Sequence, residues 1–439
     1  MALTNLNIQV KEMAVGYGHY LAIGTDGSLY SWGLNDHGQL GHGDKVNRSS
    51  PTKVGTQKME NGRIVYPTTI EYKTDWTQVV CGDYHSVALD SQGAAYGFGL
   101  NTNTQAGVGA TIDNYHNGIG GRSSRGDILI PSAGFRTVPM YANTPNPGQS
   151  DTFFGPASLI KAAANYTVII YAYPGDIPTR TSYIRGGTWV YGGNSFLFEH
   201  VDSGFKPGPT TEFRDLANLR GGSRFGESAR LLSIDKCEVG RNFIAATTGG
   251  SQIYCVGTMP NSMYGIYGND FGTTQTNFWK ALRRSDVSDI ANPIDNTGYI
   301  DFAVGDDFIL AIDSEYRLHG MTFATSNGTE IPSTSVGNFG VRILAPSATT
   351  NSPGVYHGMA LLDSNRRWLN VSCGAKHAII SDVDGNIFSM GNNEYGQLGR
   401  NYGTTSDITT MGQLELPANA TGFKIHACGP QASLIAKES

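Results

Sequence analysis

A chain of 439 residues is too long for one ordinary hydrophobic core, so it must form several domains or a repeat array. Only 15% of its residues are charged, whereas 57 are glycine, a composition typical of strands joined by polar turns. The net charge of −6 argues against a phosphate-backbone ligand, so we do not expect nucleic acid to be the main partner.

The sequence predicts neither a membrane span nor a targeting segment. The longest apolar run, YTVIIYAY from Tyr166 to Tyr173, is far shorter than the ~20 residues that a helix needs to cross a bilayer. The N-terminus, MALTNLNIQVKEM, lacks the basic and apolar regions of a signal peptide. We therefore expect synthesis in the cytoplasm without a signal peptide.

The first regular pattern along the chain is AVGYGHYLAIGTDGSLYSWGLNDHGQLGHG, residues 14–43. It predicts two strands joined by a short turn, a tight hairpin at Asp26-Gly27, a third strand and then a turn rich in glycine and asparagine. The pattern returns in the same register over residues 80–109. Three weaker copies follow, marked by AAANYTVII, EVGRNFIAATTGG and AVGDDFILAIDSEYRLHG.

A sixth copy over residues 372–401 is again clear, and a seventh begins as ACGPQASLIAKES. The turn GLNDHGQLG of the first copy, residues 33–41, is almost repeated in the sixth as GNNEYGQLG, residues 391–399. Units of this kind cannot bury both faces of a sheet alone, so their repetition predicts a closed or stacked array.

One column of small residues aligns the copies. It reads Gly16, Gly82, Ala164, Gly240, Gly305, Gly374 and Gly429. Such a column suggests strands that approach one another closely, where a larger side chain would clash. We assign these glycines a structural role.

Two further columns carry larger side chains. Three residues after the glycine the column reads His19, His85, Thr167, Phe243, Phe308, His377 and Ala432. Just before the glycine that closes the third strand it reads Trp32, Phe98, Tyr191, Val256, His319 and Met390. Because Phe, Thr and Ala replace histidine in the first column, we interpret its histidines as packing and hydrogen-bonding residues between sheets rather than catalytic groups.

The fold class that follows is all-β, a seven-bladed β-propeller in a single domain over residues 1–439. We expect the blades to begin near residues 14, 79, 162, 237, 303, 371 and 426. The seventh copy supplies only two strands, so we expect the N-terminal segment Leu6–Val10 to help close the last blade. Long insertions are expected at about residues 110–155, 195–232, 259–296 and 322–362.

These residues resemble a known family. The pattern V-x-C-G-x-x-H, seen in VVCGDYH and VSCGAKH, together with DGSLYSWGLN and GQLG, is similar to the RCC1 repeat. The resemblance implies a seven-bladed propeller that presents a binding surface. Members of that family include a GTPase exchange factor that docks on chromatin, regulatory domains of ubiquitin ligases and bacterial enzyme inhibitors.

Function is expected in the insertions, because loops on a rigid scaffold are free to vary. Tyrosine offers a large contact area at low entropic cost, and asparagine and serine supply adaptable hydrogen bonds. The candidate protein-binding residues are Tyr115, Arg122, Arg125, Arg220, Arg224, Tyr264 and Tyr267.

Several short motifs resemble functional sites but can be explained as parts of the repeat or as chance matches. The tripeptide Arg125-Gly126-Asp127 resembles an adhesion motif, and residues 382–386, DVDGN, resemble the start of a calcium loop, but the second occupies a hairpin position of the repeat. His37 and His42 lie beside aspartates in the recurring turn, so a metal site there is a weak hypothesis. Cys237 and Cys255 are predicted on neighbouring strands, and reduced buried thiols are favoured over a disulfide.

No catalytic motif, metal site or cofactor site is predicted, so we expect a non-enzymatic module that binds other proteins. The composition favours a subunit of a large assembly, such as a bacteriophage virion component in the tail or on the surface. The alternative hypothesis is a soluble regulator of the RCC1-like type, either a GTPase nucleotide-exchange factor or an enzyme inhibitor.

Overall fold

The computed structural model of the chain contains strands and no helices among the residues that it describes. Those residues are 8–60, 63–64, 69–103, 105–107, 127–132, 152–154, 156–171, 183–185, 187–192, 214–215, 234–241, 243–247, 252–260, 273–281, 298–306, 308–322, 360–400, 408–414, 416 and 423–437. It follows that this part of the chain holds no helix long and apolar enough to cross a membrane.

The chain divides into two compact units. Unit 1 comprises Met1–Leu3, Ser195–Pro207 and Asn218–Glu438, and unit 2 comprises Thr4–Asn194, Gly208–Ala217 and Ser439. Each unit is a series of four-stranded antiparallel sheets whose strands are hydrogen-bonded in chain order. Each sheet corresponds to one copy of the sequence repeat.

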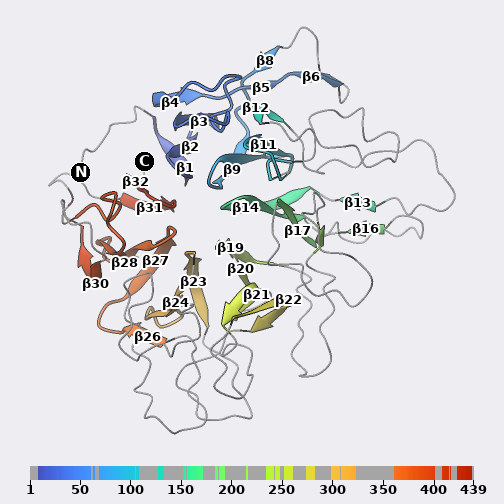
Figure 1. Ribbon diagram of the computed structural model, residues 1–439. Coiled ribbons are helices and arrows are strands. Elements are labelled where there is room, and N and C mark those ends of the chain that lie inside the picture. The colour runs from blue at the N-terminus through green and yellow to red at the C-terminus, as the bar shows by residue number, and fades with distance from the viewer. Residues whose placement is uncertain are drawn as a thin grey trace. The chain divides into compact units, whose positions relative to one another are not determined.

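Unit 2 contains sheets 1, 2 and 3. Sheet 1 consists of β1 (Val10–Val15), β2 (His19–Gly24), β3 (Leu29–Gly33) and β4 (Arg48–Lys53); sheet 2 of β9 (Trp76–Cys81), β10 (His85–Asp90), β11 (Ala95–Gly99) and β12 (Ile128–Ser132); and sheet 3 of β14 (Ala157–Ala163), β15 (Tyr166–Tyr171), β17 (Gly187–Gly192) and β18 (Arg214–Asp215). Strand β9 packs against β1 and β2, and β14 packs against β9 and β10, so successive sheets lie side by side in unit 2 (Figure 1).

Three two-stranded ribbons complete unit 2. They are β5 (Thr56–Gln57) with β8 (Ile70–Glu71), β6 (Met59–Glu60) with β7 (Arg63–Ile64), and β13 (Thr152–Phe154) with β16 (Tyr183–Arg185). The last of these pairs is parallel.

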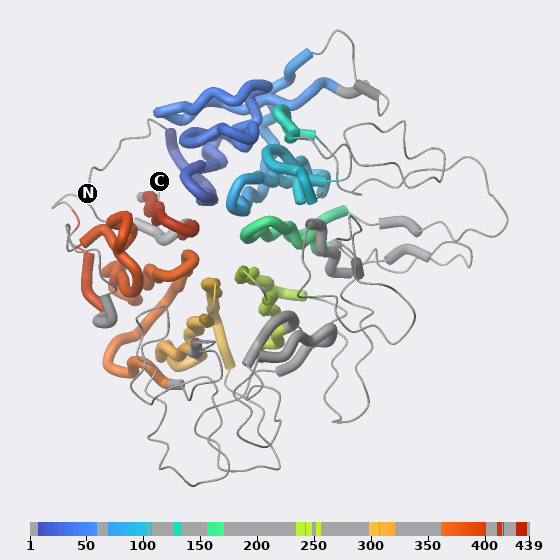
Figure 2. Tube along the Cα trace, viewed as in Figure 1, coloured from blue at the N-terminus to red at the C-terminus, as the bar shows by residue number. Residues whose placement is uncertain are grey.

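Unit 1 contains sheets 4, 5 and 6 and the two-stranded sheet 7. Sheet 4 consists of β19 (Lys236–Val239), β20 (Phe243–Thr247), β21 (Ile253–Pro260) and β22 (Thr273–Ala281); sheet 5 of β23 (Tyr299–Val304), β24 (Phe308–Asp313), β25 (Leu318–Thr322) and β26 (Ala360–Asp363); sheet 6 of β27 (Trp368–Cys373), β28 (His377–Asp382), β29 (Ile387–Gly391) and β30 (Ile408–Gln413); and sheet 7 of β31 (Phe423–Cys428) and β32 (Ser433–Lys437). Figure 2 follows this order from β19 in yellow-green to β32 in red.

The core of each unit lies between neighbouring sheets. All six residues of β10, β24 and β28, the second strands of their sheets, are buried, because both faces of a second strand are covered. Trp76 and Phe98 pack with Leu21 of sheet 1, and Trp368 packs with Phe308 of sheet 5. Truncating one such indole to alanine costs about 3–5 kcal/mol.

In four sheets the fourth strand lies in a segment that the sequence suggested to be an insertion. These strands are β12, β18, β22 and β26, which overlap the segments 110–155, 195–232, 259–296 and 322–362. Local sequence did not reveal them because an outer strand has one poorly covered face and thus a weak apolar pattern. The chain therefore returns to its sheet before each segment ends.

At the N-terminus, the end of the segment Leu6–Val10, which was expected to help close the last blade, belongs to sheet 1 instead. Val10 is the first residue of β1 and pairs with Gly24, and the carbonyl of Gln9 accepts a hydrogen bond from the Thr25 amide. Both residues therefore belong to sheet 1. Leu6 lies outside the described residues.

Strand pairing corrects two repeat columns. In sheet 3 the turn pairs Ala163 with Tyr166, as Gly82 pairs with His85, so Ala163 and Tyr166 occupy the glycine and histidine positions instead of Ala164 and Thr167. In sheet 5, Met321 pairs with Ile309, so Met321 takes the place assigned to His319. Degenerate repeats offer no side chain that anchors the register locally, and the hydrogen bonds decide it.

Candidate functional site

Within each unit, neighbouring sheets meet at the small-residue column. A Cβ atom built at Gly16 would lie 2.0 Å from Cε1 of His19 and 2.6 Å from the carbonyl oxygen of Gly82 in the next sheet. At Gly374 the corresponding distance to the carbonyl oxygen of Gly429 would be 2.2 Å. Only glycine fits between its own sheet's ring and the next sheet's backbone, which explains why the column holds glycine at Gly82, Gly240 and Gly305 as well.

The histidines that stand three residues after the column glycine donate hydrogen bonds across the sheet boundary. Nε2 of His19 lies 3.0 Å from Oγ of Ser86, and the Ser86 hydroxyl donates to the carbonyl oxygen of Gln39 at 2.8 Å. Since the only hydroxyl proton of Ser86 goes to Gln39, His19 must donate its Nε2 proton to Ser86. His19 is therefore the neutral Nε2-protonated tautomer.

The same relay recurs at the next boundary. Nε2 of His85 lies 2.9 Å from Oγ1 of Thr167, whose hydroxyl donates to the carbonyl oxygen of Gln105 at 2.7 Å. At a third boundary, Nε2 of His377 lies 2.7 Å from Oγ of Ser433. These histidines connect sheets, and all three are buried.

Burial determines the protonation state of the three histidines. Desolvation lowers the pKa of His19 and of His85 to about 3, and that of His377 to about 4. Their Nδ1 atoms have no hydrogen-bond partner within the described ranges. Desolvation outweighs the backbone hydrogen bond that favours the charged form of each ring, so the rings stay neutral at physiological pH.

The turn that follows the third strand is built by one asparagine and one glutamine. Oδ1 of Asn35 accepts the Leu40 amide at 2.8 Å, and Oδ1 of Asn393 accepts the Leu398 amide at 3.1 Å. Asn101 repeats this contact in sheet 2. The Oε1 atoms of the glutamines accept the amides two residues earlier, in the pairs Gln39 with His37, Gln105 with Asn103 and Gln397 with Tyr395.

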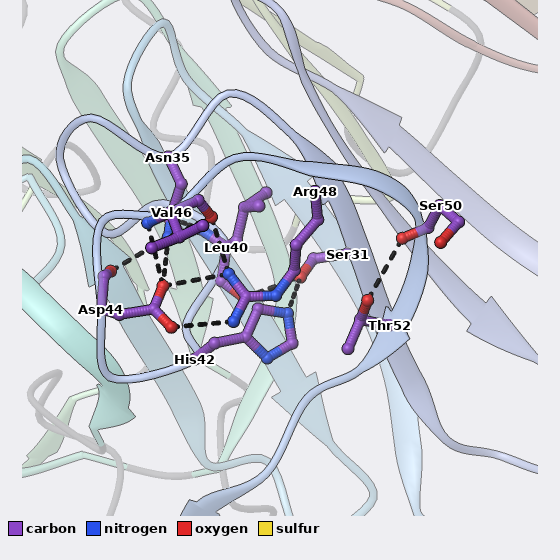
Figure 3. Close-up of polar contacts among 9 residues, drawn as sticks. All are labelled: Ser31, Asn35, Leu40, His42, Asp44, Val46, Arg48, Ser50 and Thr52. Atoms are coloured by element: carbon purple, nitrogen blue, oxygen red, sulfur yellow. Dashed lines mark hydrogen bonds and ion pairs between the residues drawn. The ribbon is translucent and has the colours of Figure 1, made fainter.

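A serine at the base of the turn completes its network (Figure 3). Ser31 donates to the carbonyl oxygen of Leu40 at 2.7 Å and accepts from Nε2 of His42 at 2.9 Å. In sheet 6, Ser389 donates to Leu398 while Nε of Arg400 donates to Ser389. His42 and Arg400 therefore play the same structural part, and burial followed by the Arg48 charge lowers the pKa of His42 to about 4.

The first turn also carries a paired cation and carboxylate. Asp44 accepts two hydrogen bonds from Arg48, at 3.0 and 2.9 Å (Figure 3), and these bonds hold the pKa of Asp44 at about 2. Asn35 donates to the carbonyl and carboxylate of Asp44. Asn35, Asp44 and Arg48 thus stabilise the turn by hydrogen bonds to one another.

Of the discounted motifs, the adhesion tripeptide is the one most clearly explained. Asp127 accepts from Nζ of Lys45 at 2.6 Å and lies 3.4 Å from Nδ1 of His37. Its carboxylate is therefore already paired. Arg125 and Gly126 lie outside the described residues.

The other discounted motifs are also parts of the repeat. The Asp382 carboxylate accepts the amides of Asp384 and Asn386, so it caps a hairpin. Among the described residues, no group of three or more His, Cys, Asp or Glu side chains is placed to hold a metal ion. All five cysteines lack disulfide bonds, and Cys237 and Cys255 lie on β19 and β21, which are separated by β20 rather than adjacent as expected.

The candidate binding residues of the insertions all lie outside the described residues. They are Tyr115, Arg122, Arg125, Arg220, Arg224, Tyr264 and Tyr267. Trp32 is buried at the end of β3 and stacks on Tyr20 with ring centroids 5.4 Å apart.

Comparison with known proteins agrees with the repeat pattern. A family model described as the regulator of chromosome condensation (RCC1) repeat matches residues 26–89 and 384–431, and a second model with the same description matches residues 10–39, 76–105 and 368–397. The chain belongs to the RCC1-repeat family. The matched segments of this RCC1-repeat protein cover sheet 1, the first three strands of sheet 2, sheet 6 and the first strand of sheet 7.

Curated relatives are similar to about a quarter of the chain. The ultraviolet-B receptor UVR8 of Arabidopsis thaliana is 30% identical over 107 residues, which are 24% of this chain and 21% of the receptor. Protein pim1 of Schizosaccharomyces pombe is 38% identical over 100 residues, 23% of this chain and 18% of pim1. The RCC1-repeat protein thus matches about a fifth of the length of these relatives.

Solved structures extend the likeness to the whole chain. Human WBSCR16 has a TM-score of 0.57 at 15% identity, covering 98% of this chain and 87% of its own. Prp20p of Saccharomyces cerevisiae has a TM-score of 0.57 at 16% identity, covering 96% and 80%. At such identities the likeness shows the fold, which is an all-β propeller of the RCC1 type.

Proposed function

We propose that this RCC1-repeat protein is a non-enzymatic regulator that acts by binding another protein. The observation that carries the proposal is the RCC1 repeat itself, whose recurrent polar residues are engaged within and between sheets. The repeats therefore supply a rigid scaffold, and recognition is left to the surface around them.

Related structures support a protein as the partner. The Prp20p structure is described together with its binding properties to Gsp1p and histones, and another similar structure, with a TM-score of 0.54, is Kap60 bound to yeast RCC1. Gsp1p, histones and Kap60 are described as partners of those yeast proteins and not of the present chain. For the present chain we infer the class of ligand, a folded protein or a peptide segment of one.

The regulator hypothesis is favoured over a role as a bacteriophage virion subunit. The virion hypothesis draws on composition alone, whereas the regulator hypothesis draws on the family. Within the regulator class, a GTPase exchange factor and an enzyme inhibitor both remain compatible with a propeller that presents a surface.

Affinity capture with the full chain separates these roles. The purified chain is immobilised and exposed to a lysate of its native source, and the retained proteins are quantified by mass spectrometry. A regulator retains one partner near equal stoichiometry, and recombinant partner then binds in titration calorimetry. Capture of several capsid or tail proteins instead would favour the assembly role and contradict the proposal.

We further propose that the propeller has seven blades and that the N-terminal segment completes the last one. Among the residues that the structure describes, sheet 7 has two strands, β31 and β32, whereas sheets 1 to 6 each have four. An unpaired edge strand leaves backbone amides and carbonyls without partners. Residues 1–7, which precede the first sheet, are the segment that we expect to supply them.

A further inference from the structure

The hairpin of sheet 5 carries a tyrosine where other sheets carry glycine. Its position is occupied by Gly27, Gly93 and Gly385 in sheets 1, 2 and 6, with φ angles of 77°, 77° and 81°. In sheet 5 the residue is Tyr316, with φ of 66°. The turn is otherwise the same, since the amide of Tyr316 bonds to the carbonyl of Asp313 at 2.9 Å. A left-handed backbone is unfavourable for a residue that carries a side chain.

The tyrosine side chain lies on the surface beside an arginine. At Gly27 a Cβ atom would lie 1.9 Å from the carbonyl oxygen of Thr74, so that sheet has no room for a side chain. In sheet 5 the ring of Tyr316 is instead partly exposed, and the guanidinium carbon of Arg367 lies 4.4 Å from its centroid. The stacking holds the planar guanidinium in place without an ion pair.

Next to this pair, two β-bulges present apolar side chains to solvent. The register of the first strand shifts around Ile300 in sheet 5 and around Leu369 in sheet 6, and these residues are 49% and 42% exposed. The same bulge holds polar residues in unit 2, namely Lys11, Thr77 and Ser158. Strands β23 and β27 pack together, so the two apolar bulges are on adjacent strands (Figure 1).

The polar residues at this bulge contribute to their own sheets, but the apolar ones do not. Thr77 donates to the carbonyl oxygen of Leu89 at 3.1 Å, and Ser158 donates to that of Ile170 at 3.1 Å. Aliphatic side chains make no such bond, and their exposure leaves their transfer free energy largely unrealised. Ile300 and Leu369 thus stabilise the isolated protein less than buried aliphatic side chains would.

One more apolar residue adjoins the arginine. The amide of Val383 donates to the carbonyl oxygen of Arg367 at 2.9 Å, and Val383 is 39% exposed. Arg367 makes no ion pair with the described residues, whereas its neighbour Arg366 lies 3.6 Å from Asp382. We refer to Ile300, Tyr316, Arg367, Leu369 and Val383 as the sheet 5–6 patch.

We propose that the sheet 5–6 patch is a docking surface for a partner polypeptide that carries an acidic side chain beside aliphatic ones. The inference rests on the proposed protein-binding function and locates one of its contact surfaces. Arg367 supplies a preoriented fork of donors for a carboxylate. Ile300, Leu369 and Val383 supply apolar area around it, and the strained Tyr316 persists because it holds the arginine.

A displayed peptide library tests the proposal on the full chain. Random 12-residue peptides on yeast are selected against the wild-type protein, and enriched peptides are measured by fluorescence anisotropy. The expected peptides carry Asp or Glu next to Leu, Ile, Val or Phe. Arg367→Ala weakens their binding at least tenfold.

Tyr316→Gly separates binding from stability. Glycine tolerates the left-handed backbone, so this variant keeps or raises the melting temperature while it weakens the peptide at least tenfold. Leu361→Thr is the matched control, because Leu361 is a 52% exposed aliphatic residue on β26 outside the patch; it leaves peptide binding unchanged.

Three results would overturn the proposal. These are enrichment of peptides without acidic residues, binding to the Tyr316→Gly and Arg367→Ala variants as tight as binding to the wild-type chain, or a dimer in sedimentation velocity that Tyr316→Gly dissociates, which would identify a second copy as the occupant. A chain that carries both Tyr316→Gly and Arg367→Ala separates this proposal from the proposed function. If that double variant still captures its stoichiometric partner from lysate, the regulator function stands and only the location of the surface is wrong.

Discussion

At the scale of single residues, the most constrained side chains are those that meet across sheet boundaries. His19 must carry a proton on Nε2 to donate to Ser86, because the Ser86 hydroxyl already donates its own proton to the carbonyl oxygen of Gln39. The equivalent position in sheets 4 and 5 holds Phe243 and Phe308, whose phenyl rings lie against the column glycines Gly240 and Gly305 as the His19 ring lies against Gly16. The position therefore accepts a phenyl ring as well as an imidazole.

The buried histidines predict a stability that falls in acid. Their pKa values of about 3, 3 and 4 for His19, His85 and His377 lie below the unfolded value near 6.5. Between these limits the unfolded chain binds more protons, so stability is fully present above pH 6.5 and declines as pH falls, by about 1.4 kcal/mol per pH unit for each histidine. The melting temperature measured from pH 7.5 to 5 should drop accordingly.

Replacing all three histidines by phenylalanine tests this cause. The triple variant should melt near the wild-type temperature at pH 7.5, because phenylalanine occupies the same position in sheets 4 and 5. Its melting temperature should then depend much less on pH. The same slope in both proteins would assign the acid sensitivity to other groups.

At the scale of elements, the GQLG turn is stabilised by its asparagine. Asn393 accepts the Leu398 amide and donates to the carbonyl of Arg400. Asn393→Ala leaves both backbone groups without that partner, which should cost about 1–3 kcal/mol. We expect a melting temperature lower by a few degrees in calorimetry, with Asn393→Asp intermediate because it keeps the acceptor oxygen.

A neighbouring substitution provides the control for the turn. Glu394 is exposed, and its backbone amide donates a hydrogen bond to Oδ1 of Asn392. Glu394→Ala should therefore leave the melting temperature unchanged. If it destabilises the protein as much as Asn393→Ala does, the asparagine is not what holds the turn.

At the scale of the whole molecule, the proposed closure of the last blade makes residues 1–7 essential for stability. Replacing them by a glycine-serine linker of equal length removes the side chains that would pack on sheet 7 and keeps the chain length. We expect the melting temperature to fall by more than about 5 °C. An unchanged melting curve would show that sheet 7 is completed in another way or stays two-stranded.

The sequence by itself determined the repeat, its hairpins and its close contacts. Turn residues such as Asp26-Gly27 and the glycine before each second strand impose local backbone geometry, and contiguous residues are enough to reveal it. Strong periodicity also located the first three strands of sheets 1, 2 and 6. Family membership followed from the same short motifs.

Tertiary structure alone decided which residues meet. Ser86 lies 67 positions from His19, so no local pattern could show that its hydroxyl fixes the histidine tautomer. The outer strands β12, β18, β22 and β26 and the register of sheets 3 and 5 depend on hydrogen bonds between strands. Likewise, Tyr316 and Arg367 are brought together by the packing of neighbouring sheets, since cross-sheet contacts are set by the fold and not by adjacency along the chain.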